Sequence, residues 1–318
     1  MPTKLLIDAD PGISDALTVL AAMADPSIDL LALTGVAGTV SGQQATRNLQ
    51  FLTGIADPLR HPRIGQSDTA VAPADAAPVG MPSHYLLNGR FGLGDVEPEV
   101  PDLHNRRESA KLICDVAREF PQQLSVLCLG PLTNLAMAMD LDAELPNLLD
   151  SITILGGAFA GGGDVTSAAE FNIWADPGAA QVVLNANVRK RLIPRDVSDV
   201  PLLTFDDVDR LTGLIPSTPA GECINSMLLF AVRSSRQHLP TESVSIPAAH
   251  ALSVVAGTAS AQGDAGWVEI ELQGRITTGM TVLERRSVRN RLANCEIITS
   301  TDHHAVTDTL CLNLRRVG

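Results

Sequence analysis

The chain has 318 residues, which is enough for one large α/β domain or two small ones. Hydrophobic residues make up 45%, aromatic residues only 3%, and the formal net charge is −13, so we expect an aliphatic core and exclude nucleic acid and an anionic membrane surface as partners. The five cysteines are scattered without a CxxC motif, so we expect free, buried thiols. No secretory signal precedes the first apolar run, and no run reaches the ~20 residues of a membrane span. We therefore expect a cytoplasmic protein.

The first predicted element is a short apolar strand that ends in an acidic turn. Asp8, Asp10 and Asp15 follow one another closely around a Pro-Gly pair, a pattern that predicts a buried strand and a tight turn. Clustered carboxylates repel one another unless a proton or a metal ion lies among them. Three interpretations stay open: a solvated loop that caps a helix, a dehalogenase-like phosphotransferase and a hard-cation site. Gly12 argues against the phosphotransferase, whose motif has Thr or Val at this position.

The remaining elements follow in an alternating order that is typical of α/β proteins. We expect helices at residues 17–23, 41–52 (with Ser41 as the N-cap), 108–120, 135–139 (after a turn at 130–134), 177–185, 205–237 and 308–314. We expect strands at residues 28–36, 124–129, 152–155, 189–193, 267–272 and 295–299. Residues 56–107 are rich in Pro, Gly and Asp and predict a functional loop. The alternation predicts a mostly parallel sheet flanked by helices in a single domain.

Several motifs occur in the order found in a known family. Residues 8–16 read Asp-Ala-Asp-Pro-Gly-Ile-Ser-Asp-Ala, and further matching segments lie at residues 35–40, 129–136, 156–158, 169–177 and 279–282. Together they resemble the inosine-uridine-type nucleoside hydrolases, whose N-terminal signature is Asp-x-Asp-Pro-Gly-x-Asp-Asp-Ala. The likeness spans nearly all of residues 1–318. It implies a Rossmann-related fold, hydrolysis of the N-glycosidic bond of a ribonucleoside or similar small molecule, and a homodimer or homotetramer.

The resemblance also implies roles for individual residues. Calcium would be held by Asp10, Asp15 and the backbone carbonyl of Thr133, together with an Asp late in the chain. Asp10 would also be the base that takes a proton from the attacking water. Glu170 and Asn172 would form hydrogen bonds with the ribose. Asp8 would orient the residues that bind the metal.

Three positions in the expected ribose site depart from the family pattern. Ser14 stands where the family has an Asp that binds a ribose hydroxyl, Thr39 stands in place of an Asn, and Asp164 replaces another Asn. All three side chains still form hydrogen bonds, so we expect them to contact the substrate. The change at Ser14 removes a charge-assisted hydrogen bond, which is the stronger kind.

The largest departure lies late in the chain. His250 stands in place of the calcium-binding Asp, and Ala249 in place of the histidine proposed as the acid for the leaving base. Imidazole is a poor ligand for calcium, which prefers oxygen. His250 could instead join Asp10 and Asp15 in binding manganese, iron or zinc. Alternatively, the protein binds a nucleoside-like or sugar ligand without metal or cleavage, or cleaves an altered substrate with His250 as acid or base. A neutral histidine without a role is the fourth interpretation.

Two segments are expected to face the base, and one histidine pair is expected on the surface. The first segment covers residues 82–95, with His84, Tyr85 and Asn88 as its candidates. The second contains Arg233, Arg236 and His238. The adjacent His303 and His304 are predicted to lie on the surface without a function.

Overall fold

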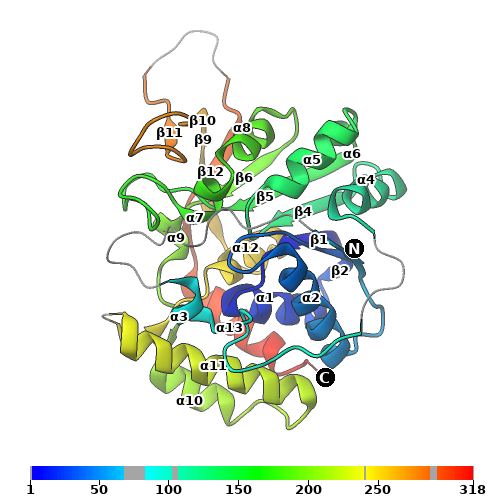
Figure 1. Ribbon diagram of the computed structural model, residues 1–318, viewed down its shortest axis with the longest axis vertical. Coiled ribbons are helices and arrows are strands. Elements are labelled where there is room, and N and C mark those ends of the chain that lie inside the picture. The colour runs from blue at the N-terminus through cyan, green and yellow to red at the C-terminus, as the bar shows by residue number, and fades with distance from the viewer. Residues whose placement is uncertain (1, 68–82, 102–106, 240, 287–291, 318) are drawn as a thin grey trace.

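The computed structural model describes residues 2–67, 83–101, 107–239, 241–286 and 292–317. An eight-stranded sheet forms its centre, in the order β3-β2-β1-β4-β5-β6-β12-β9 (Figure 1). Neighbouring strands pair in parallel, except that β9 runs antiparallel to β12. The strands are β1 (Thr3–Ala9), β2 (Ile28–Gly35), β3 (Arg63–Gly65), β4 (Leu124–Cys128), β5 (Leu149–Leu155), β6 (Lys190–Ile193), β9 (Ala261–Gly266) and β12 (Cys295–Thr301). The predicted mostly parallel sheet is confirmed.

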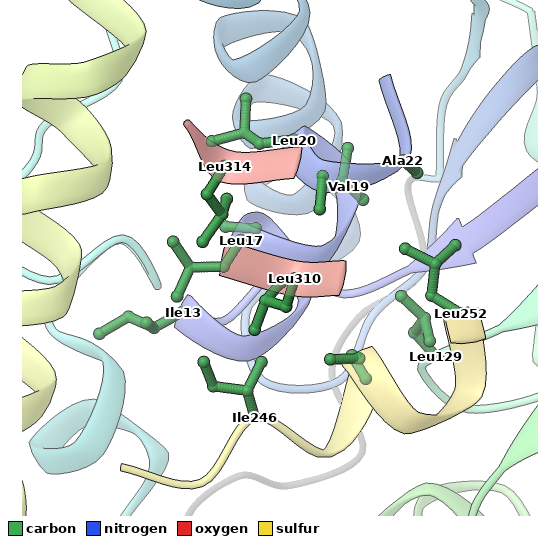
Figure 2. Packing of buried hydrophobic residues seen from close by; sticks show 14 of the residues in the cluster. Ile13, Leu17, Val19, Leu20, Ala22, Leu129, Ile246, Leu252, Leu310 and Leu314 are labelled. Atoms are coloured by element: carbon green, nitrogen blue, oxygen red, sulfur yellow. The ribbon is translucent and has the colours of Figure 1, made fainter. Parts of the chain in front are cut away.

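Helices cover both faces of this sheet and divide the core into two clusters. One face carries α1 (Ile13–Ala24), α2 (Gly42–Ala56), α11 (Pro219–His238), α12 (Pro247–Ala256) and α13 (His303–Leu314). The other carries α4 (Ser109–Glu119), α5 (Thr133–Leu141) and α8 (Pro177–Asn185). Figure 2 shows Leu17 and Leu20 of α1 beside Leu310 and Leu314 of α13. Each fully buried leucine stabilises the fold by about 1.5–3 kcal/mol, so this packing fixes α1 directly behind the acidic turn.

Shorter elements connect these layers. They are α3 (His84–Asn88), α6 (Leu145–Leu148), α7 (Phe171–Ala175), α9 (Arg195–Ser198), α10 (Phe205–Thr212), the pair β7 (Leu203–Thr204) and β8 (Ser243–Val244), and the pair β10 (Val268–Ile270) and β11 (Thr281–Leu283). In Figure 1, α10 and α11 lie at one end of the molecule and the β10–β11 hairpin lies at the other. Within the described ranges, no helix combines the length and the apolar composition needed to cross a bilayer.

Most predicted elements are present, with differences at particular places. The Ser41 side chain caps α2 by accepting a hydrogen bond from the Gln44 amide at 3.2 Å, as predicted. The helix predicted over 205–237 is interrupted at residues 213–218, where a glycine and a proline end α10 before α11 begins. The strand predicted at 267–272 belongs to the separate β10–β11 hairpin. The sheet order places β1 between β2 and β4, so the chain connections leave β1 toward opposite edges of the sheet. In α/β sheets, ligands bind at the carboxyl end of the strands at such a point.

Candidate active site

A cavity of about 280 Å³ opens where β1, β4 and β5 end. Its size lies near the lower limit of small-molecule sites, about 300–1,000 Å³. Its wall includes the predicted site residues Asp10, Ser14, Asp15, Thr39, Asp164, Glu170 and Asn172. These residues come from segments that are far apart in the sequence. The fold therefore brings together the acidic turn and the predicted sugar-binding segment, and we call this space the central cavity.

The carboxylate of Asp10 lies at the bottom of a narrow backbone cradle. One oxygen, Oδ2, accepts a hydrogen bond from the Thr39 amide, and a hydrogen bond also joins Asp10 to Asp15. A Cβ placed on Gly38 would come within 2.1 Å of Oδ2, and one on Gly130 within 2.4 Å of Oδ1. Both positions therefore require glycine, because the Asp10 carboxylate fills the space that a side chain would take.

Burial controls the protonation of the acidic turn. It raises the pKa of Asp10 to about 6 and the pKa of Asp15 well above its ordinary value, and the negative charge of Asp10 raises the latter further. Asp8 lies behind them, outside the cavity wall, where its Oδ1 accepts hydrogen bonds from Thr34 Oγ1 at 2.6 Å and Asn134 Nδ2 at 2.8 Å. Burial raises the pKa of Asp8 to about 7. These contacts of Asp8 fix the end of β1, directly before Asp10 in the chain.

Glu170 links the cavity to the start of α7. Its carboxylate accepts hydrogen bonds from the amides of Gly157 at 2.8 Å, Asn172 at 3.0 Å and Ile173 at 3.2 Å. It is therefore the N-cap of α7, where a negative charge interacts favourably with the helix dipole. Burial nevertheless raises the pKa of Glu170 to about 8, and the neighbouring Asp164 contributes in the same direction.

Asn172 and Asp164 complete the predicted ribose side. The amide nitrogen of Asn172 donates to the carbonyls of Leu129 at 2.7 Å and Leu155 at 3.0 Å, so it joins the segments that follow β4 and end β5. Since both amide protons are used, Asn172 can offer a ligand only its Oδ1 oxygen. Within the described part of the chain, Oδ1 of Asp164 is buried and has no hydrogen-bond partner. Burial raises the pKa of Asp164, and the charge of Arg195 opposes this effect.

The side chains of Ser14 and Thr133 each form a hydrogen bond with a distant part of the chain. Ser14 Oγ accepts a hydrogen bond from the Ala248 amide at 3.2 Å, which joins the start of α1 to the start of α12. Thr133 is the first residue of α5, and its hydroxyl donates to Asp176 Oδ2 at 2.7 Å. The wall of the central cavity contains Ser14 but not Thr133.

The structure places His250 away from the acidic turn. The side chain is fully buried, its Nδ1 lies 2.8 Å from Thr301 Oγ1, and its ring meets that of His303 edge to face at 5.2 Å. Burial lowers the pKa of His250 to about 4, so the imidazole is neutral near pH 7. It is not part of the cavity wall. The two predictions that gave His250 a chemical role, as metal ligand and as acid or base, therefore lack the required proximity, because the ring faces the β12–α13 corner.

Arg195 and Asp199 are cavity residues that the sequence analysis missed. Arg195 Nε donates to Asp199 Oδ2 at 2.7 Å, and Nη1 donates to the Gly162 carbonyl at 3.3 Å. Both side chains line the central cavity. The available signal was the charged segment 195–199, Arg-Asp-Val-Ser-Asp, shortly after the strand predicted at 189–193, since charged residues at the carboxyl end of a parallel strand face the ligand side of a sheet.

The predicted base-facing residues are only partly correct. His84 and Asn88 of α3 line the central cavity, whereas Tyr85 is 61% exposed and lies outside its wall. From α11 the wall takes Ala231, Ser234 and Ser235 instead of Arg233, Arg236 and His238. The helix turns those three away: Arg233, for example, pairs with Asp95 at 2.7 Å. His303 was predicted on the surface and is instead half-buried against His250.

The side chains available for a metal ion are fewer than in the predicted set. Asp10 and Asp15 form a pair of buried, mutually repelling carboxylates, which is a suitable start for a hard cation such as calcium. Among the described residues, no group of three or more His, Cys, Asp or Glu side chains is arranged to hold a metal ion. The combination of His250 with Asp10 and Asp15 for a softer metal is therefore not formed. Further ligands would come from backbone oxygens, from neutral side-chain oxygens such as those of Asn, Ser and Thr, or from water.

Known proteins resemble this chain in sequence and in fold. The family model described as inosine-uridine preferring nucleoside hydrolase matches residues 5–308. Uridine nucleosidase 1 of Arabidopsis thaliana is 38% identical over 209 residues, which is 64% of this chain and 60% of that protein. The inosine-uridine preferring nucleoside hydrolase of Leishmania major is 27% identical across 100% of this chain and 99% of its own. A solved plant nucleoside hydrolase shares the fold, with a TM-score of 0.86 and 24% identity over 99% of both chains.

Proposed function

The chain belongs to the inosine-uridine preferring nucleoside hydrolase family, and on this premise we propose that its central cavity hydrolyses the N-glycosidic bond of a ribonucleoside. The two relatives described above carry names for uridine and inosine-uridine hydrolysis, so uridine and inosine are the first substrates to consider. The observation that carries the proposal is the position of Asp10, a buried carboxylate between two glycines at the end of β1, in the wall that also holds the predicted sugar ligands.

Asp10 is the base for the attacking water. Its carboxylate takes a proton as the water oxygen bonds to C1′ of the ribose, and the electron pair of the breaking C1′–N bond moves to the base. The sugar passes through an oxocarbenium-like state, so positive charge develops near C1′. Asp10, whose pKa of about 6 leaves its carboxyl group ionised near pH 7, favours that charge electrostatically.

The ribose lies against the side of the cavity formed by Glu170, Asn172 and Asp164. Asn172 presents a carbonyl oxygen, and Asp164 presents an oxygen without a protein partner among the described residues. Both can accept hydrogen bonds from sugar hydroxyls. Ser14 and Thr39 line the same cavity, and the Thr39 amide donates to Asp10. Calcium would be held by Asp10 and Asp15, with the Thr133 carbonyl as a further candidate; when bound, it makes water more acidic.

The experiment is a substrate panel with a matched variant. Purified protein is incubated with uridine, inosine, cytidine and adenosine, with and without added calcium, and the free base is quantified by chromatography. We expect turnover of at least one nucleoside and a loss of about 10²–10⁴-fold in Asp10→Asn, the range for removing a general base. Binding of nucleosides without release of base would instead indicate a homologue that holds its ligand without cleaving it.

A further inference from the structure

The leaving base of the nucleoside needs a proton donor on the side of C1′ that faces away from Asp10. When the C1′–N bond breaks, an electron pair remains on a nitrogen of the base, and a proton donor lowers the barrier to that step. Ala249 has no group to donate, and His250 next to it is turned toward Thr301 and His303. The start of α12 therefore supplies no acid to the reaction in this chain.

His84 lies in the cavity wall on α3. Among the described residues, it is the single histidine in that wall. Its ring centroid lies 4.2 Å from that of Phe171, at an interplanar angle of 50°. Phe171 stands between Glu170 and Asn172 in the sequence, so this contact places the imidazole next to the predicted ribose site. Burial lowers the pKa of His84, which makes its protonated form a stronger acid than an exposed imidazolium.

The short helix α3 is fixed on two sides. Asn88 Oδ1 accepts a hydrogen bond from the Ile13 amide at 2.9 Å, next to the acidic turn. On the other side, Ser234 Oγ of α11 donates to the Leu86 carbonyl at 2.8 Å. These two bonds join α3 to the start of α1 and to α11. A catalytic side chain on this helix would therefore keep a defined position relative to Asp10.

In the described part of the chain, the wall near α3 and α11 contains no carboxylate. Leu87, Ala231, Leu239 and Val244 lie there together with His84, Asn88, Ser234 and Ser235, whereas the carboxylates lie on the segments that follow β1, β5 and β6. A planar base favours apolar surroundings and a ribose favours hydrogen-bonding groups, so a nucleoside has one preferred orientation. With the ribose above Asp10, the base extends toward α3 and comes within reach of His84.

We propose that His84 is the general acid that protonates the leaving base, a role that rests on the proposed nucleoside hydrolysis. The C1′–N bond breaks, its electron pair goes to the base nitrogen, and that nitrogen takes the proton from the His84 imidazolium. At the other side of C1′ the water oxygen forms its bond to carbon and gives a proton to Asp10. Asp10 then releases a proton to solvent and His84 takes one up, so the cycle balances.

Three further titratable side chains of the wall, Arg195, Glu170 and Asp164, differ from His84 in their contacts. Arg195 does not release its proton in the accessible pH range and is held by Asp199. Glu170 accepts three backbone hydrogen bonds through its two oxygens. Asp164 has a buried oxygen without a partner among the described residues and a raised pKa, so it is the direct competitor and belongs in the test.

The test compares substrates that differ in their need for an acid. Wild-type protein, His84→Gln, Asp164→Asn and the control His304→Gln, which changes an exposed histidine of α13, are assayed with inosine, uridine and p-nitrophenyl β-D-ribofuranoside. Nitrophenolate leaves without protonation, whereas a nucleobase does not. We expect His84→Gln to lower kcat for the nucleosides by about 10²-fold or more, with less than about tenfold change for the nitrophenyl riboside, while His304→Gln matches the wild type.

Each other outcome has a distinct meaning. Nucleoside cleavage by His84→Gln at the wild-type rate overturns the proposal, and so does an equal loss on both kinds of substrate. A selective loss on nucleosides in Asp164→Asn but not in His84→Gln assigns the acid to Asp164 instead. If the wild type cleaves only the nitrophenyl riboside, the protein has no working acid and the role of His84 is refuted. If it cleaves neither substrate, the proposed function itself fails.

Discussion

Substitution of Gly38 by alanine tests how closely the cradle positions Asp10. The added Cβ would lie 2.1 Å from Asp10 Oδ2 and 2.9 Å from Pro131 Cδ. Because Cβ contacts below 3.0 Å essentially do not occur, the carboxylate oxygen has to move by about 0.9 Å. A displacement of about 1 Å in a reacting group lowers catalysis by about 10²-fold. We therefore expect kcat/KM of Gly38→Ala to fall about 100-fold while the fold is kept.

The assay measures the initial rate of nucleoside cleavage together with circular dichroism and the unfolding midpoint. Gly54→Ala is the matched control, because a Cβ there meets nothing within 4 Å; it should keep full activity and gain about 0.5–1 kcal/mol in stability, since alanine is favoured over glycine inside a helix. Gly130→Ala, with its Cβ 2.4 Å from Asp10 Oδ1, should behave like Gly38→Ala. Full activity in a folded Gly38→Ala protein would refute the assignment of Asp10 as the base.

The remaining predictions concern stability and metal. Asn172→Ala leaves the buried carbonyls of Leu129 and Leu155 without a donor, so urea titration should show a loss of about 1–3 kcal/mol for each; an unchanged midpoint would contradict this contact. Since the folded pKa of Glu170 is raised from 4.5 to about 8, the folded protein binds more protons in that window, and the free energy of unfolding should fall as pH rises through it. Glu170→Gln should flatten this slope, and an equal slope in both proteins would count against the shift. Chelation should lower turnover and calcium should restore it; turnover insensitive to both argues that no divalent ion takes part.

Much of the fold was accessible from the sequence because its signals are local. The parallel strands at the centre are continuous apolar runs, as in β4, and a serine at position 41 predicted the start of α2. β9 was missed because its sequence, Ala-Gln-Gly-Asp-Ala-Gly, has no alternation; it is an edge strand that pairs with β12. Such pairing depends on the tertiary fold, which local propensity does not describe.

Cavity residues were predicted more successfully at the ends of strands than on helices. Nine predicted residues line the central cavity. Seven of them follow a strand or belong to a recognisable motif, and the other two, His84 and Asn88, lie on α3. On α11 the error was one of helical phase: Arg233 turns outward, while its neighbour Ser234 reaches the cavity. The orientation of His250 could not be predicted, since position in a motif does not fix which neighbours a side chain meets. The residues of the loop at 68–82 and 102–106 lie outside the described ranges.

The most direct measurement of the central claim is product stoichiometry in phosphate-free buffer. Wild-type protein and Asp10→Asn are each incubated with the best nucleoside of the panel, and the free base and the reducing sugar are quantified over time. The account predicts equal amounts of base and ribose from the wild type, and rates at least about 10²-fold lower from Asp10→Asn. Base release that requires added phosphate, or that continues unchanged in Asp10→Asn, would contradict hydrolysis by a water molecule activated at Asp10.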